Sequence, residues 1–137
     1  MTRSTPISEL MASPVQTVGL DAKLSEVRRA LTQGNFHHVP VVDGDTLVGI
    51  VSSRDLLRVY RDFSSKVSEK ADDLLEHGST VAGIMSTELV TIRSRESVEA
   101  AIELIASGTI HSVLVLDEEE RLVGIVTDTD LLDYLCS

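Results

Sequence analysis

Gly49-Ile50-Val51-Ser52-Ser53-Arg54-Asp55 returns later in the chain as Gly124-Ile125-Val126-Thr127-Asp128-Thr129-Asp130. Both stretches contain a glycine, two aliphatic residues, a hydroxyl residue, two variable residues and an aspartate. The aliphatic residues favour a strand, and a hydroxyl followed three residues later by a carboxylate is typical of the start of a helix. Each stretch therefore predicts a junction between a strand and a helix.

The similarity extends on both sides of this motif. The chain matches itself at a shift of 74 residues, which aligns Met11 with Met85 and His37 with His111, and the shift widens to 75 after one inserted residue. An internal repeat of this kind indicates two copies of one structural unit. We divide the chain into a first repeat (1–60), a partly helical linker (61–80) and a second repeat (81–137).

Each repeat has the pattern of a short strand, a helix, two strands and a second helix. Apolar residues recur at helical spacing in the first helix of each copy, and short β-branched runs at 39–42 and 113–116 are followed by acidic turns. Gly34 and Gly108 are expected to end the first helices in the left-handed conformation. The pattern predicts an α/β (α+β) fold in which two small units pack together.

Composition excludes several classes of function. The 137 residues carry a formal net charge of -10, which disfavours binding to nucleic acid or to an anionic membrane. No apolar run reaches membrane-spanning length, no signal peptide is apparent, and Cys136 is the only cysteine, so we expect a cytoplasmic protein. Adjacent His37 and His38 point to opposite faces of a strand, and we expect no metal site. No catalytic motif is present, so we expect no enzyme activity.

The glycine-to-aspartate motif has two interpretations. In the first, the hydroxyl and the carboxylate form a capping box that satisfies free backbone N–H groups. In the second, the helix N-terminus and the hydroxyl bind a phosphate while the carboxylate accepts hydrogen bonds from a ribose. His37, His38 and His111 are likewise either ordinary surface or core residues or ligand contacts. The residues alone leave both choices open.

Taken together and in order, the two motifs and the segment His37-His38-Val39-Pro40-Val41-Val42-Asp43 resemble the CBS domain family, specifically a tandem pair forming a Bateman module. The resemblance implies two βαββα units related by a pseudo-twofold axis, with sites for AMP, ADP, ATP or S-adenosylmethionine in the cleft between them. It implies that Asp55 and Asp130 hold ribose hydroxyls and that Ser52 and Thr127 contact phosphate. The remaining ligand-binding residues it implies are Thr17, Val18, His37, His38, Val39, Pro40, Arg54, Thr91, Ile92, His111, Ser112, Val113 and Thr129.

These observations favour a non-catalytic regulatory module that senses an adenine nucleotide or adenosyl ligand, forms a homodimer and signals to a separate effector protein. The alternative is a CBS pair that binds no ligand and serves only for dimerisation. The two sites are expected to be unequal. Asp128 adds a carboxylate to the second motif, and Ser112 replaces the histidine found in the first repeat, so the second site should bind phosphates more weakly.

Overall fold

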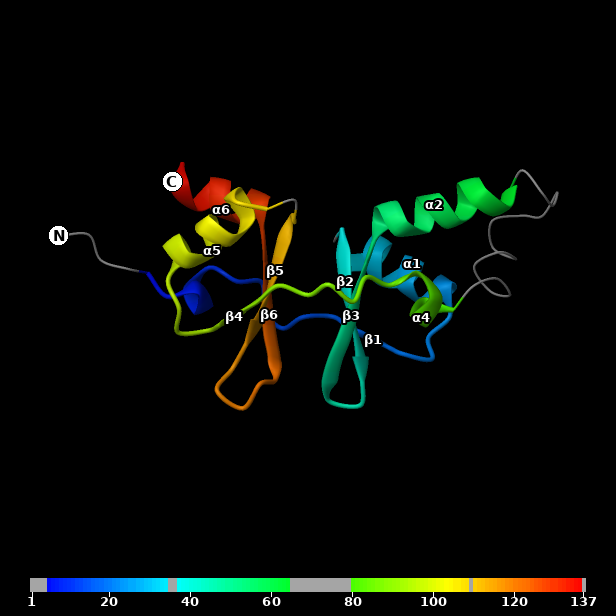
Figure 1. Cartoon of the computed structure of the whole chain (residues 1–137), viewed down its shortest axis with the longest axis horizontal. Coiled ribbons are helices and arrows are strands. Elements are labelled where there is room, and N and C mark those ends of the chain that lie inside the picture. The colour runs from blue at the N-terminus through cyan, green and yellow to red at the C-terminus, as the bar shows by residue number, and fades with distance from the viewer. Residues whose placement is uncertain (1–4, 35–36, 65–79, 109, 137) are drawn as a thin grey trace. The chain divides into compact units, whose positions relative to one another are not determined.

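The computed structural model describes residues 5–34, 37–64, 80–108 and 110–136, which fall into two compact units (Figure 1). One unit comprises Gln16–Glu88, and the other combines Met1–Val15 with Leu89–Ser137. By sequence, residues 5–15 belong to the first repeat, yet they fold with the second. Residues 65–79, where the helical part of the linker was predicted, lie outside the described residues.

The unit Gln16–Glu88 contains a three-stranded sheet in the order β1 (Val18–Gly19), β2 (His38–Asp43) and β3 (Thr46–Ser52). β1 is parallel to β2, and β2 is antiparallel to β3. The helices α1 (Leu24–Gly34) and α2 (Ser53–Ser64) contact each other and the sheet, and the short α4 (Val81–Ile84) contacts β3. The parallel pairing follows because α1 carries the chain back between β1 and β2.

The second unit repeats this arrangement. Its sheet has the order β4 (Thr91–Arg93), β5 (Ser112–Leu116) and β6 (Leu122–Thr127), with a parallel and then an antiparallel pairing. The helices α5 (Val98–Ala106) and α6 (Asp128–Leu135) pack on it, and a single 3-10 turn, η1 (Ile7–Glu9), comes from the N-terminal segment. The two sheets and their helices confirm the α/β fold predicted from the repeat.

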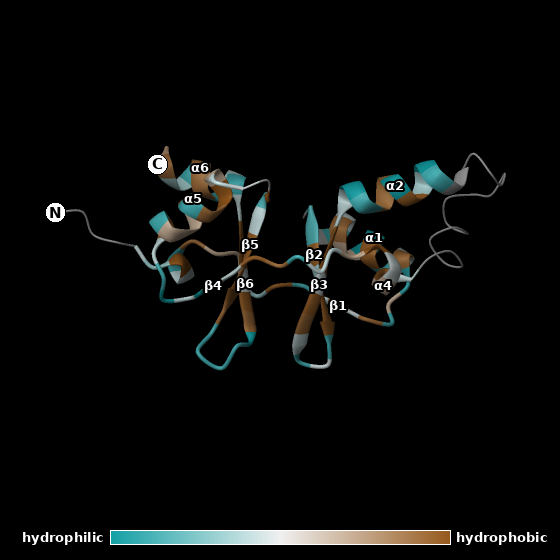
Figure 2. Ribbon diagram, viewed as in Figure 1, coloured by the Kyte–Doolittle hydropathy of each residue, from teal (hydrophilic) through white to brown (hydrophobic). Residues whose placement is uncertain are grey.

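Aliphatic side chains at the predicted helical and strand positions form the core of each unit. In the first unit, Leu24 and Val27 of α1 are fully buried against Val39, Val41 and Val51. Val98 and Ala101 of α5 pack in the same way against the strands of the second unit. Figure 2 accordingly shows the strands as mostly hydrophobic and the turn between β5 and β6 as hydrophilic. Burial of this surface is the main contribution to stability.

Each sheet pairs with a short segment whose sequence belongs to the other repeat. Ala12 pairs with Ile125 of β6, and Ser86 pairs with Ile50 of β3. The preceding residues, Met11 and Met85, lie so close to Gly124 and Gly49 that a Cβ atom at either glycine would collide with the methionine side chain. Because Gly49 and Gly124 have no side chain, the neighbouring segment can approach the sheet closely. The alignment of the two repeats does not predict that each sheet pairs with a segment from the other repeat.

The turn between β5 and β6 is fixed by Asp117. Its carboxylate accepts hydrogen bonds from the backbone N–H groups of Glu119 (2.9 Å) and Arg121 (2.8 Å) and from Nε of Arg121 (2.8 Å). The Arg121 backbone N–H, followed by its side chain, holds the pKa of Asp117 below the ordinary value of 3.8. The same contact raises the pKa of Arg121.

Two local expectations differ from the structure. α2 continues to Ser64, beyond residue 60 where the first repeat was expected to end, so the first residues of the expected linker belong to this helix. Gly108 does not have a positive φ, because α5 already ends at Ala106 with Ser107 as its right-handed C-cap. The glycine with a positive φ among the described residues is Gly44, in the turn between β2 and β3.

Candidate ligand-binding site

The repeated motif lies at the same place in both units, where the last strand of the sheet ends and the second helix begins. The hairpin register places His38 beside Ser52 and Ser112 beside Thr127. The backbone N–H of Ser53 donates to the carbonyl of His37 (3.0 Å), and that of Asp128 donates to the carbonyl of His111 (3.1 Å). The histidine segments and the helix starts are thus held together in each unit.

Both motifs form a capping box. The backbone N–H of Ser52 donates to Oδ2 of Asp55 (2.8 Å), and that of Asp55 donates to Oγ of Ser52 (3.2 Å). Thr127 and Asp130 make the same pair of bonds at 2.9 and 3.2 Å. The capping interpretation of the sequence is therefore correct, and it accounts for one oxygen of each carboxylate.

The other oxygen of Asp55 has a weaker neighbour. Nη1 of Arg58 lies 3.4 Å from Oδ1, and the two side chains are 56% and 20% exposed. A partly exposed ion pair at this distance contributes little to stability, so another hydrogen-bond donor can readily replace Arg58. A carboxylate oxygen offers two lone pairs, so Asp55 is able to accept hydrogen bonds from vicinal hydroxyls while it caps α2.

The two sites differ most at Asp128. Its Oδ1 accepts the backbone N–H of Thr129 (2.8 Å), and its Oδ2 lies 3.3 Å from Nδ1 of His111. A carboxylate thus occupies the N-terminus of α6 and contacts the histidine. Ser53 stands at the equivalent place in the first repeat and carries no charge. Sequence reasoning identified Asp128 as unfavourable to phosphate but did not predict its contact with His111, which depends on the hairpin register.

The remaining residues implied by the resemblance fall into two groups. Most of the polar ones are accessible at the end of the sheet where the motif lies: His37, Arg54, His111 and Thr129 are exposed, and His38 and Ser112 are half-buried. Thr17 and Thr91 are also exposed, immediately before β1 and at the first position of β4. The apolar ones belong to the interior of their units, and these are Val18, Val39, Pro40, Ile92 and Val113.

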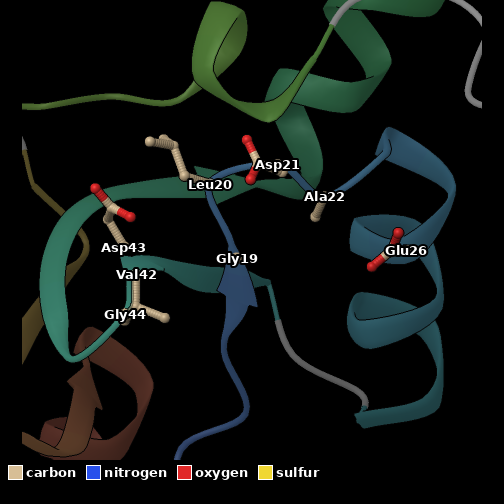
Figure 3. Close-up of a pocket in the computed structure, with 8 residues that line it drawn as sticks. All are labelled: Gly19, Leu20, Asp21, Ala22, Glu26, Val42, Asp43 and Gly44. Carbon is tan, nitrogen blue, oxygen red and sulfur yellow. The ribbon is translucent and has the colours of Figure 1, made fainter.

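A pocket of about 340 Å³ lies at the opposite end of the first sheet (Figure 3). The end of β1, the turn between β2 and β3, and α1 line it, and three carboxylates face it from different elements: Asp21, Glu26 and Asp43. This acidic pocket is separated from Ser52 and Asp55 by the length of β2, and its charge disfavours a phosphate. It is not part of the predicted site.

Among the described residues, no three His, Cys, Asp or Glu side chains are grouped so that they could hold a metal ion. No helix in this part of the chain combines the length and the apolar character needed to cross a membrane.

A sequence model of the CBS domain matches residues 7–62 and 81–137. The chain belongs to the CBS domain family. Its two matched segments make it a tandem CBS pair. A CBS domain-containing protein of Dictyostelium discoideum is 36% identical over 132 residues, which cover 94% of this chain and 90% of that protein. The CBS pair spans only 13% to 40% of seven other relatives, several of which are enzymes.

Solved structures share this fold. A CBS domain pair crystallised with 5′-methylthioadenosine and S-adenosyl-L-methionine has a TM-score of 0.78, 26% identity, and 98% coverage of both chains. The protein CBSX2, crystallised with AMP, has a TM-score of 0.76 and 22% identity over 96% of both chains.

Proposed function

We propose that this CBS pair is a non-catalytic regulatory module of the cytoplasm that binds an adenine nucleotide or a related adenosyl ligand. The observation that carries the proposal is the repeated constellation of hydroxyl, carboxylate and helix N-terminus, which lies beside an exposed histidine in both units. Similar pairs crystallised with AMP, or with 5′-methylthioadenosine and S-adenosyl-L-methionine, support the choice of ligand class.

Each residue of the first site has a chemical role in this proposal. The carboxylate of Asp55 accepts hydrogen bonds from the ribose hydroxyls with the oxygen that does not cap α2. His37 and Arg54 are exposed and supply donors for a phosphate, and the N-terminal end of α2 adds its favourable dipole. Ser52 remains the cap of α2 and contributes its hydroxyl to the same surface.

The second site has an equivalent carboxylate for the ribose, Asp130, but the residues around the phosphate position differ. The carboxylate of Asp128 already occupies the start of α6 and contacts His111. A phosphate a few ångströms from this carboxylate is disfavoured by about 1 kcal/mol or more, which weakens binding several-fold. We therefore assign the phosphorylated ligand to the site of Ser52 and Asp55, and an uncharged or cationic adenosyl compound to the site of Thr127 and Asp130.

A thermal melting scan tests the proposal. A ligand that binds only the folded protein stabilises it by about 2.7 kcal/mol at a hundredfold excess over its dissociation constant. We expect at least one of AMP, ADP, ATP and S-adenosylmethionine to raise the melting temperature at millimolar concentration. If all four leave the midpoint unchanged, the ligand-sensing function is wrong.

The second candidate is a structural CBS pair that binds no ligand. It is favoured by the capping boxes, because they give the motif aspartates a role without a ligand. Both candidates include a homodimer, since large apolar side chains remain exposed on the second helix of each unit. In the ligand-sensing case, the dimer passes the signal of ligand binding to a separate effector protein.

A further inference from the structure

Arg58 lies beside the carboxylate that the proposed function assigns to the ribose. Its Nη1 is 3.4 Å from Oδ1 of Asp55, the oxygen that does not cap α2. Helical side chains tilt toward the N-terminus of their helix, so Arg58 reaches back over the first turn to a carboxylate three residues earlier. The guanidinium is therefore held near the end of α2 to which the proposed function assigns the phosphate.

The guanidinium of Arg58 is able to move and to donate elsewhere. An arginine side chain carries several N–H donors in a planar fork, and the contact with Asp55 uses one of them at the long end of the hydrogen-bond range. The Arg58 side chain is 56% exposed, whereas that of Asp55 is 20% exposed. Another acceptor that approaches from solvent can therefore reach the guanidinium.

The second repeat has the opposite charge at the position of Arg58. At the shift of 75 residues, Arg58 aligns with Asp133, just as Asp55 aligns with Asp130. α6 carries no basic residue, yet Asp130 caps this helix as Asp55 caps α2. The capping box forms in both repeats, so it does not need the arginine. A difference in ligand preference between the two sites would account for it.

We propose that Arg58 is a specificity-determining residue that favours phosphorylated ligands at the first site. The ribose of the ligand replaces Arg58 at Oδ1 of Asp55, and the displaced guanidinium donates to the phosphate of the same ligand. This inference rests on the proposed function, and it adds a residue outside the set that the family resemblance implies.

The two steps act differently on ligands with and without a phosphate. Displacing Arg58 costs little, because a partly exposed ion pair contributes little to stability. A charge-assisted hydrogen bond from the guanidinium to a phosphate is much stronger. A nucleotide therefore gains more than it loses, whereas an uncharged nucleoside has to displace Arg58 and gains nothing. Arg58 should control the ratio of the affinities for AMP and adenosine.

The variant Arg58→Gln tests this role, because glutamine removes the charge and is as favourable in a helix as arginine. Calorimetry measures the binding of AMP, and displacement of AMP measures the binding of adenosine. All compared proteins carry Asp130→Asn, which weakens the second site, and melting temperatures establish that they fold. Arg61→Gln is the matched control, since it removes the same charge from an exposed side chain of α2 that pairs with Asp62.

AMP is expected to bind about fivefold more weakly in Arg58→Gln, because a donor to the phosphate is lost. Adenosine should bind equally well or up to about twofold more tightly, and Arg61→Gln should change neither affinity. An equal loss for AMP and adenosine would show that Arg58 only positions Asp55. Unchanged AMP affinity in Arg58→Gln, or the same loss in Arg61→Gln, would show that Arg58 does not contact the phosphate. Each of these results overturns the inference and leaves the proposed function standing. If AMP does not bind the wild type, the inference fails together with the assignment of a nucleotide to the first site.

Discussion

Asp128 is the residue at which the two copies of the repeated motif differ most in chemistry. It places a carboxylate where the first copy has Ser53, and this carboxylate accepts from the backbone of Thr129 and contacts His111. The same two groups, a helix N–H and an imidazole, are suitable donors for a phosphate. In the proposed function, this one side chain changes the ligand preference of an arrangement that the two repeats otherwise share.

The variant Asp128→Ser is expected to give the second site the phosphate affinity of the first. Removing the carboxylate should tighten AMP binding at that site several-fold, because an electrostatic cost of about 1 kcal/mol is relieved. The measurement is calorimetry in an Asp55→Asn background, in which the first site is weakened. Asp45→Ser makes the same chemical change at an exposed turn of the other unit. Equal affinities with and without Asp128 would contradict the assignment.

At this scale the sequence predicted the capping box as one of two interpretations of the motif, because a capping box depends only on a spacing of three residues. Residues that meet through tertiary structure were harder to predict. The contact of His111 with Asp128 requires the register of β5 and β6, and the proximity of Met85 to Gly49 requires a segment that no local pattern connects to β3. The burial of Val39 and Val113 likewise follows from the packing of the core of each unit.

The hairpin turns of the two units are stabilised in different ways. The turn between β2 and β3 uses Gly44 with a φ of 64°. The turn between β5 and β6 is longer (117–121, against 44–45 in the first unit), places Glu120 at a φ of 65°, and relies on Asp117 to bind its backbone. A glycine adopts this conformation without strain, whereas the longer turn needs side-chain hydrogen bonds.

Asp117→Asn tests the role of this turn through pH. The folded-state pKa of Asp117 is lowered, so its contribution to stability is fully present above the unfolded value near 3.8 and is lost as the pH falls through the folded-state value. The wild type should therefore exceed Asp117→Asn in free energy of unfolding at pH 7, and the difference should shrink below pH 4. Urea titrations at several pH values measure it, with Asp45→Asn as the control. A difference independent of pH would contradict this role.

Gly124→Ala tests whether the segment that contains Met11 packs against β6. A Cβ atom at this position collides with the side chain of Met11, so we expect a loss of about 1–3 kcal/mol in the free energy of unfolding. Met11→Ala removes the two side-chain atoms that lie nearest to the new methyl group and so relieves most of the collision. The double variant should therefore lose less free energy of unfolding than the two single variants lose in total. A double-mutant cycle by urea denaturation measures this difference. Strict additivity would show that Met11 does not lie on Gly124.

On the scale of the whole molecule, an internal duplication has produced two units of the same fold with different charges. Self-similarity in the sequence predicted the number of units, their element order and the place of the motif in each. It did not predict that residues up to Val15 belong to the second unit, because an alignment of repeats records similarity and not contact. The apolar positions on α2 and α6 were also preserved by the duplication, although their neighbours changed sign.

The central claim is that the motif aspartate binds a ribose in addition to capping a helix, and AMP titration of Asp55→Asn against the wild type tests it most directly. Asparagine keeps an oxygen that accepts the backbone N–H of Ser52, but its amide nitrogen replaces the oxygen available to the ribose. Melting temperatures establish that the variant folds. We predict that AMP binds the wild type and that its affinity falls about tenfold or more in Asp55→Asn, because a charge-assisted hydrogen bond is lost. Equal affinity for AMP in the two proteins, or no binding to the wild type, would contradict the account.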